Sequence, residues 1–263
     1  MKQLLNTAIN AALKAGKAIS EIYHSRDFDI EIKGDNSPLT KADTASHNVI
    51  MSFLTKTNIP VLSEEGKKMS YDVRKDWKQL WIVDPIDGTK EFINRNGEFT
   101  VNISLIENNY PIFGIIYSPV KSLLYYAIKN NGSFKLKTNT NLSSLNNFSK
   151  ININKEKSST IKIIGSRSHS SKEFKIWIEN RFTNFELITI GSSLKFCILA
   201  EGEADIYPRL GPTSEWDIAA GHIILEEAGG KLKTIDNKDI LYNTKEDILN
   251  PHFIAYGNLS KVD

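Results

Sequence analysis

The segment 81–92 carries two carboxylates, Asp84 and Asp87, between a short apolar run and a Gly-Thr step. The apolar run predicts a buried strand, and we expect it to end at Pro85, which has no N–H to donate. Asp84 would then lie at the end of the strand and Asp87 in a turn that leads into a helix. Hard oxygen ligands beside the N–H groups of a helix start suit a divalent cation and the phosphate that it carries.

Further carboxylates occur near predicted element ends, at Asp43, Glu64, Glu65 and Asp217. The five histidines are scattered and there is one cysteine, so no Cys/His cluster has the spacing of metal ligands. An all-oxygen set indicates Mg²⁺ or Mn²⁺ instead of zinc. Carboxylates packed close together repel one another unless a cation neutralises them. These residues would therefore bind metal if the fold brings them together, which sequence spacing alone does not show.

Composition places the chain among ordinary globular proteins, with 263 residues, 40% hydrophobic and 24% charged. A formal net charge of +2 does not suggest a protein that coats nucleic acid or binds membranes through a polybasic patch. The single Cys197 excludes a disulfide framework and fits a reducing compartment. No stretch approaches the roughly 18 apolar residues of a membrane span, and 4–23 lacks the unbroken apolar region of a signal peptide. We therefore expect a cytoplasmic protein.

The elements that must position the carboxylates begin with two helices. Apolar residues at helical spacing predict a helix over 5–23, and a capping-box pattern over 40–43 predicts the start of a second one. In that second helix Asp43 would serve as a cap partner. Strands are expected at 28–32, 59–62, 99–105, 111–117 and 123–128, with a hairpin turn at 131–132. The last three strands predict an antiparallel sheet.

The stretch 138–160 is rich in Asn, Ser, Thr and Lys and cannot build a core. It predicts a polar junction between an N-terminal α+β metal-binding half, 1–137, and a C-terminal α/β half, 161–263. Strands expected at 161–164, 185–190 and 204–207 alternate with helices at 174–181, 193–199 and 215–227, and further strands follow in 231–256. Such α/β units bind ligands at strand C-termini and helix N-termini.

Three motifs follow one another along the chain: Ser63-Glu64-Glu65, Asp84-Pro85-Ile86-Asp87-Gly88-Thr89 and Glu215-Trp216-Asp217-Ile218-Ala219-Ala220-Gly221. Together they resemble the inositol monophosphatase superfamily of lithium-sensitive, Mg²⁺-dependent phosphatases, with every acidic position matched. Within it the chain is similar to the bacterial 3′(2′),5′-bisphosphate nucleotidases. That closer likeness lies in 35–40, 61–65, 88–93, 95–102, 166–169, 191–197 and 207–209. It runs nearly end to end, is weakest across 135–160, and implies a layered α-β-α-β-α sandwich.

The resemblance implies a set of metal ligands. Glu64, Asp84 and the main-chain carbonyl of Ile86 would hold one Mg²⁺, and Asp84, Asp87 and Asp217 would hold a second. Whether a third ion joins them stays open. Glu65 would lie near the first ion, through water. Two metals about 3.5–4 Å apart can activate an attacking water and stabilise the leaving oxygen of an in-line displacement.

The resemblance also implies catalytic and substrate-binding residues. Asp43 and the Thr89 hydroxyl would orient and deprotonate the attacking water, and the N–H groups of Gly88 and Thr89 would contact the phosphate. The adenosine and 5′-phosphate end would be lined by Ser166, His169, Gly191 and Lys195, with Arg209 assisting. At the phosphate that is removed, the substrate would also meet Glu64, Ile86, Asp87 and Asp217. Lys195 would pair with the phosphate that is not hydrolysed.

The implied activity is hydrolysis of the 3′-phosphate of adenosine 3′,5′-bisphosphate (PAP) to AMP and phosphate. The 2′,5′ isomer and the sulfated nucleotide (PAPS, giving APS) are further expected substrates, and the implied use is in sulfur metabolism. Two alternatives stay open: an inositol or fructose phosphate monoesterase with the same metal machinery, and a non-catalytic nucleotide-binding module. The expected partner is a small molecule and not a nucleic-acid polymer. A monomer is expected, and peripheral attachment to the inner membrane stays open.

Overall fold

The computed structural model describes residues 1–25, 28–34, 38–138, 148–153, 160–167 and 172–258. Its elements are α1 (Lys2–Ser25), β1 (Glu31–Ile32), β2 (Pro38–Leu39), α2 (Lys41–Leu54), the 3₁₀ turn η1 (Thr55–Thr57), β3 (Val61–Ser63), α3 (Tyr71–Arg74), β4 (Gln79–Asp87), α4 (Thr89–Ile93), β5 (Thr100–Glu107), β6 (Tyr110–Ser118), β7 (Leu123–Ile128), β8 (Gly132–Lys137), β9 (Ser149–Ile151), β10 (Ile161–Ser166), α5 (Lys172–Glu179), β11 (Phe185–Ile190), α6 (Leu194–Ala200), β12 (Ile206–Arg209), α7 (Glu215–Glu227), β13 (Lys231–Thr234) and β14 (Phe253–Tyr256).

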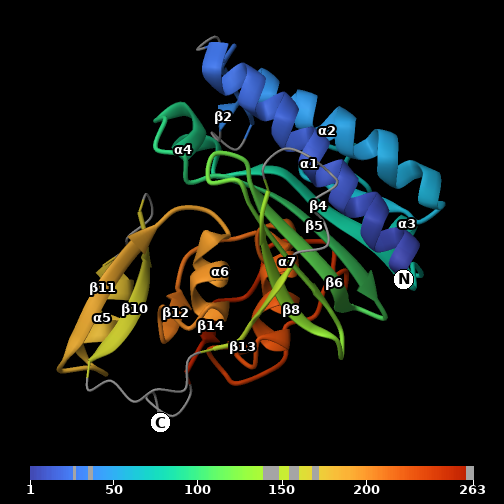
Figure 1. The fold of residues 1–263 in the computed structure, drawn as a ribbon. Coiled ribbons are helices and arrows are strands. Elements are labelled where there is room, and N and C mark those ends of the chain that lie inside the picture. The colour runs from blue at the N-terminus through green and yellow to red at the C-terminus, as the bar shows by residue number, and fades with distance from the viewer. Residues whose placement is uncertain (26–27, 35–37, 139–147, 154–159, 168–171, 259–263) are drawn as a thin grey trace.

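These elements form five layers (Figure 1). Helices α1 and α2 cover one face of a seven-stranded sheet, and α6 and α7 lie between that sheet and a five-stranded one. Helix α5 packs on the other face of the smaller sheet. The α-β-α-β-α sandwich that the resemblance implies is confirmed.

The two N-terminal helices form as their patterns predict. The apolar face of α1 is buried against the large sheet. Helix α2 begins at a complete capping box, in which the Thr40 N–H donates to Asp43 Oδ2 at 2.8 Å and the Thr40 hydroxyl accepts from the N–H of Ala42 at 3.2 Å. The strand expected at 28–32 shortens to β1, because Asp29 has a φ of +48° and interrupts the extended backbone.

The large sheet has the strand order β3-β4-β5-β6-β7-β8-β9. β3 pairs with β4 in parallel and the other pairs are antiparallel, which confirms the antiparallel sheet predicted from the three strands in succession. The edge strand β9 comes from the stretch 138–160, so this stretch contributes to the first sheet. The division of the chain at 138–160 stays a prediction.

Strand β4 differs from the prediction at Pro85. The strand was expected to end there, but it continues to Asp87, so that expectation is wrong. Pro85 is tolerated because β3 pairs with β4 only as far as Val83, and because the register with β5 shifts between Asp84 and Asp87. At such a bulge the missing N–H breaks no ladder bond. The Pro85 carbonyl instead accepts a hydrogen bond from Ser46 Oγ at 2.7 Å.

Helix α7 joins the two sheets. It also begins at a capping box, formed by Ser214 and Asp217, and nine of its residues are buried. Two glycines bring its backbone close to its neighbours: a Cβ on Gly114 of β6 would lie 2.7 Å from the Ala220 carbonyl oxygen, and one on Gly221 would lie 2.4 Å from the Phe196 ring. The helix is therefore packed tightly between the sheet and α6.

The smaller sheet has the order β11-β10-β12-β14-β13, with β10 parallel to both of its neighbours. Its strands and α5, α6 and α7 confirm the alternation predicted for the C-terminal half. β12 begins at Ile206, two residues later than expected. The parallel strands carry Ser166 and Ile190 at their C-terminal ends, on the side where α6 begins.

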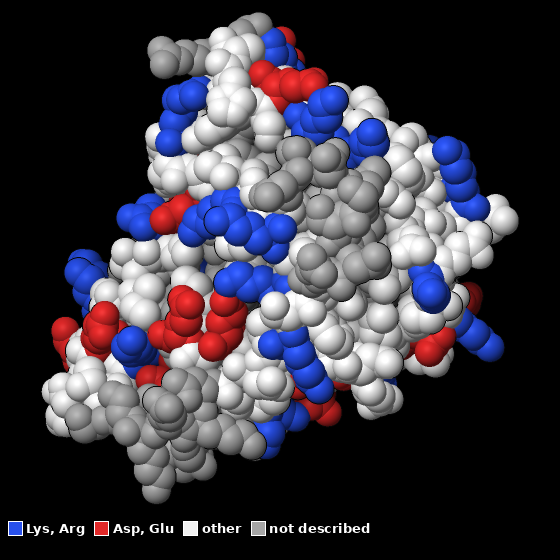
Figure 2. Space-filling model, viewed as in Figure 1, with Lys and Arg blue, Asp and Glu red and all other residues white. Residues whose placement is uncertain are grey.

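The surface carries charges of both signs. Figure 2 shows scattered side chains of both signs on one face, with a group of Lys and Arg near its centre and Asp and Glu below it on the left. This mixture agrees with the formal net charge of +2. Among the described residues, no helix has both the length and the hydropathy required to cross a bilayer.

Candidate active site

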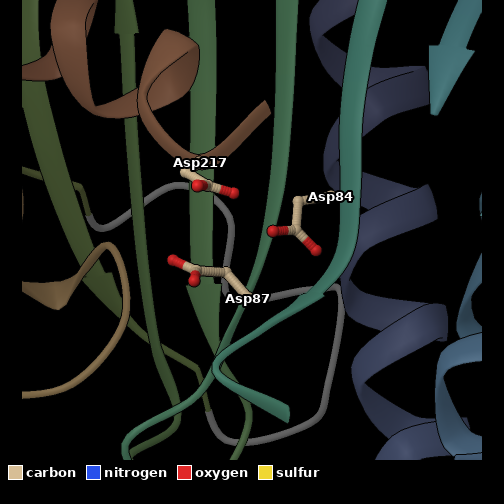
Figure 3. Close-up of side chains that lie close together, drawn as sticks. All are labelled: Asp84, Asp87 and Asp217. Atoms are coloured by element: carbon tan, nitrogen blue, oxygen red, sulfur yellow. The ribbon is translucent and has the colours of Figure 1, made fainter. Parts of the chain in front are cut away.

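Three carboxylates from two distant parts of the chain meet in one place. Asp84 and Asp87 come from β4, and Asp217 comes from the first turn of α7. One oxygen atom from each carboxylate lies within 4.8 Å of the others. Figure 3 shows the three side chains pointing into a common space between β4 and the start of α7. The convergence that spacing alone could not show is therefore present for these three residues.

The electrostatics of this cluster are unfavourable without a cation. Burial raises the pKa of Asp84 well above its usual range, and the neighbouring Glu64, Asp87 and Asp217 raise it further. Burial also raises the pKa of Asp217 to about 8, with Asp87 adding to the shift. Asp84 Oδ1 is a buried atom without a hydrogen-bond partner in the part of the chain described. A divalent cation would remove the repulsion and supply the missing partner.

Glu64 and Glu65 stand at the end of β3, beside β4. Glu64 lines the same pocket as the three aspartates. Its Oε1 accepts a hydrogen bond from Lys33 Nζ at 2.8 Å, and Glu65 accepts a second one from the same ammonium. Burial favours a neutral amine, but the two glutamates reverse that effect and raise the pKa of Lys33. Lys33 thus supplies positive charge at this edge of the acidic region.

Asp43 and Thr89 are in contact. Thr89 Oγ1 donates to Asp43 Oδ1 at 3.1 Å, while Asp43 Oδ2 accepts from the N–H of Thr40. The cap role of Asp43 and its pairing with Thr89 are therefore compatible, since they use different oxygens. Burial raises the pKa of Asp43, and its hydrogen bonds from Thr40 oppose the shift. The catalytic role of the pair stays a prediction.

The position of Asp87 depends on two residues that sequence reasoning missed. Asp87 Oδ2 accepts from both the N–H and the hydroxyl of Ser193, each at 2.6 Å. Asn102 Nδ2 donates to Ser193 Oγ at 2.7 Å. A usable signal lay in β5, where Thr100, Asn102 and Ser104 alternate with apolar residues and give the strand one polar, buried face. Asn102 on that face is paired with Asp84 across the sheet.

Cationic side chains line the same pocket as the carboxylates, and we call the part at Lys195 and Arg209 its cationic end and the part at Glu64 and the three aspartates its acidic end. The cavity, of about 260 Å³, is also lined by Lys90, Glu91 and Tyr207. Lys195 Nζ donates to the Ser192 carbonyl at 2.7 Å and lies 5.6 Å from the Tyr207 ring centroid. Burial lowers the pKa of Lys195 to about 8, against the raising effect of Asp87. Arg209 Nε is buried, with no partner among the described residues.

The other predicted substrate residues are placed as follows. Ile86, Gly88, Thr89, Ser166 and Gly191 line the pocket. The N–H of Gly191 donates to Glu98 Oε2 at 2.8 Å, so this group is already in use within the fold. Gly88 has a φ of +93° and caps α4. His169 lies outside the described residues.

An all-oxygen acidic cluster beside cationic side chains has the chemistry that a metal-dependent phosphate site requires. The chain belongs to the inositol monophosphatase family, whose model matches residues 1–261. A relative from Escherichia coli (strain K12), named 3′(2′),5′-bisphosphate nucleotidase CysQ, is 42% identical over 253 residues, which cover 95% of this chain and 98% of the relative. A relative of the same name from Buchnera aphidicola is 39% identical over 97% of this chain and 94% of its own length.

A solved structure supports the same assignment. The crystal structure of CysQ from Bacteroides thetaiotaomicron, a bacterial member of the inositol monophosphatase family, matches with a TM-score of 0.88. The two chains are 44% identical, and the match covers 98% of each. The family resemblance found in the sequence is therefore confirmed.

Proposed function

We propose that this protein hydrolyses the 3′-phosphate of adenosine 3′,5′-bisphosphate and releases AMP and inorganic phosphate. It is a phosphoric monoester hydrolase of the inositol monophosphatase family, and its relatives over nearly the full chain are named 3′(2′),5′-bisphosphate nucleotidases. PAPS, which carries the same 3′-phosphate, is a further proposed substrate.

The observation that carries the proposal is a pocket with two chemically different ends. Acidic side chains at one end suit metal ions and the phosphate to be removed, and Lys195 and Arg209 at the other end suit a second phosphate. A substrate with two phosphates uses both ends, whereas a monophosphate leaves one end unused. This favours a bisphosphate over an inositol monophosphate.

The proposed metal ligands are Glu64, Asp84, Asp87 and Asp217, with the carbonyl of Ile86. We propose that they hold two Mg²⁺ ions, and that Li⁺ inhibits by competing there. The buried, unpartnered Asp84 Oδ1 and the shared space between the aspartates support this assignment. Bound divalent cations would neutralise the phosphate oxygens and make water a better nucleophile.

The proposed catalytic pair is Asp43 with the Thr89 hydroxyl. The bond between them lets Thr89 orient a water with its oxygen, while Asp43 accepts the proton. Because burial raises the pKa of Asp43, its carboxylate is a stronger base than an exposed one. The capping box holds Asp43 in place from the opposite side. No protein nucleophile is required, since the work is positioning and charge stabilisation.

Phosphate release from a panel of substrates tests the proposal. With Mg²⁺ present, we expect adenosine 3′,5′-bisphosphate to be preferred over adenosine 3′-monophosphate, inositol 1-phosphate and fructose 1,6-bisphosphate. A chelator should abolish all release, and Mg²⁺ should restore it. A clear preference for a sugar or inositol phosphate would make the protein a monoesterase of the same family. Nucleotide binding without turnover of any substrate would indicate a non-catalytic module.

We further propose that the protein acts in the cytoplasm as a monomer. The single cysteine fits a reducing compartment and supports the proposed location. Light scattering at micromolar concentration would measure the oligomeric state, and fractionation would measure the location.

A further inference from the structure

We propose that Glu98 and Arg167 are positioning residues that set the preference of the pocket for a substrate with two phosphates. They would do so by fixing the turn 191–193, which holds Lys195. The inference rests on the proposed function, since it concerns the phosphate that is not hydrolysed.

Glu98 connects three segments of the chain. Its Oε2 accepts from Arg167 Nε at 2.7 Å and from the N–H of Gly191 at 2.8 Å, and its Oε1 accepts from Arg167 Nη2 at 2.8 Å. Arg167 Nη2 also donates to the Thr189 carbonyl at 2.9 Å. The loop before β5 is thereby tied to the C-terminal ends of β10 and β11. Paired N–H···O bonds of this kind are directional as well as strong.

The absence of a side chain at Gly191 allows its backbone to make this contact with Glu98. A Cβ there would lie 2.7 Å from Glu91 Cγ and 3.0 Å from the Glu98 carbonyl oxygen. Only glycine therefore allows the main chain to come this close to the loop that carries Glu98. The close packing of Gly191 against Glu91 and Glu98 and the hydrogen bond from its N–H together fix the start of the turn.

The position of this turn also determines where the Lys195 ammonium lies. Ser192 follows with a left-handed φ of +57°, and its carbonyl accepts the Lys195 ammonium at 2.7 Å. Its hydroxyl is bonded to Thr100 Oγ1 at 2.7 Å. Lys195 is buried, so its ammonium depends on this carbonyl for its placement. A displaced carbonyl would move the ammonium away from the phosphate that it meets.

The acidic end shares part of this support, because Ser193 belongs to the same turn, but Ser193 has a second anchor in β5. Ser193, which holds Asp87, is itself bonded to Asn102. Neither Glu98 nor Arg167 lines the pocket, so both would act through the turn and not on the substrate. Partial burial acts to raise the pKa of Glu98, but Arg167 and the N–H of Gly191 lower it below its usual value. The carboxylate therefore stays charged. Loss of Glu98 should therefore affect the cationic end first.

The test compares two substrates in three variants. Glu98→Gln removes the ion pair, Arg167→Gln removes the guanidinium, and Asp239→Asn is the control, because it breaks the Lys233–Asp239 ion pair away from the pocket. With Mg²⁺ saturating, KM and kcat are measured on adenosine 3′,5′-bisphosphate and on adenosine 3′-monophosphate. Calorimetry in chelator measures the affinity for adenosine 5′-monophosphate, whose phosphate then has no metal ion to bind and reports on the cationic end.

For Glu98→Gln we expect KM for the bisphosphate to rise about tenfold and AMP affinity to fall by a similar factor, as for a lost charge-assisted hydrogen bond. Both constants for the 3′-monophosphate should stay near wild type, as should kcat for the bisphosphate. Arg167→Gln should give the same pattern with a smaller change, because the bond between Glu98 and the N–H of Gly191 remains. The control should match wild type throughout.

Equal losses on both substrates, or no change in AMP affinity, would overturn the inference. A wild-type protein that releases no phosphate from the bisphosphate would instead overturn the proposed function, and AMP affinity would still decide the role of Glu98. If Glu98→Gln loses its cooperative melting transition, Arg167→Gln carries the test, since the Arg167 side chain is 43% exposed and its loss leaves no buried gap.

Discussion

The two ends of the pocket are built in different ways. At the acidic end, Asp84 lies at the bulged end of β4 and Asp217 in the capping box of α7, while Asp87 is also held by Ser193. At the cationic end, Lys195 lies in α6, but its ammonium is placed through a turn. Lys195 depends on a turn that is itself held from β5, and Arg209 lies at the end of β12.

This difference assigns the reaction to the acidic end and the choice among substrates to the cationic end. Residues placed by their own strand or helix keep their geometry when distant loops change, which suits a reaction common to a family. Residues placed by long-range contacts can be moved by changes elsewhere, which suits a preference that differs between relatives. We therefore expect substitutions at the acidic end to reduce turnover of every substrate, and substitutions at the cationic end to alter the choice among substrates.

The largest effect is expected for Asp84→Asn. Loss of the ligand that we propose both ions share should reduce kcat/KM by about a thousandfold on every substrate, corresponding to several kcal/mol of transition-state stabilisation. The same change removes one of several crowded negative charges, so the metal-free variant should melt at a higher temperature than metal-free wild type. Phosphate release and thermal scans in chelator measure the two effects. A variant with full activity would refute the bridging role of Asp84.

The next effect is expected for Thr89→Val. The substitution removes the hydroxyl that bonds to Asp43 and leaves the cap of α2 intact. We expect kcat to fall about a hundredfold, in the range of lost acid–base catalysis, with the melting temperature little changed. Asp43→Ala is the paired variant, and it should also cost about 1 kcal/mol of stability because the capping box is lost. If Thr89→Val retains wild-type kcat, the pair is not catalytic.

A smaller effect is expected for Ser193→Ala. The substitution removes one of two hydrogen bonds from Ser193 to Asp87 and keeps the one from its N–H. Residues that orient a ligand typically account for about 10–100-fold in metal affinity or activity, so we expect the Mg²⁺ concentration for half-maximal activity to rise by about tenfold. Mg²⁺ titration at saturating substrate measures the shift. An unchanged titration would mean that the Ser193 hydroxyl does not position Asp87.

The smallest and most selective effect is expected for Lys195→Met. KM for the bisphosphate should rise about tenfold, as for a charge-assisted bond, and KM for adenosine 3′-monophosphate should not change. In wild type the pKa of Lys195 is lowered to about 8 by burial, so the ammonium is charged below that pH and neutral above it. Its neighbours Asp87, Glu91 and Asp217 favour the charged form and Arg209 opposes it. KM for the bisphosphate should therefore rise above pH 8 in wild type and stay flat in Lys195→Met.

The features that the sequence predicted are set by local patterns, and those that it did not predict depend on distant segments. The cap at Thr40–Asp43, the motif around Asp84 and the start of α7 are local patterns, and the structure has all three elements where they were expected. The extension of β4 past Pro85 was not predictable, because it depends on where the neighbouring strand β3 stops. Strand β9 was missed for a related reason: only pairing with β8 makes its polar segment a strand.

The unpredicted site residues are those that act between distant segments. Lys33 reaches Glu64 across a gap of 31 residues, and Ser193 reaches Asp87 across 106. Neither pair has a spacing that a periodic pattern reveals. Glu98 and Arg167 belong to this group as well, since their bond joins the two halves of the chain.

The close seating of α7 has a mechanical consequence. Gly114 lets β6 come close to the backbone of α7, and Gly221 lets Phe196 of α6 come close to it. Helix α7 is therefore packed tightly against both elements. A shift of α7 toward β6 or α6 would therefore make it overlap one of these elements. Adding a methyl group at position 114 would push Ala220 away from β6 and would move Asp217, one turn earlier in the helix, with it.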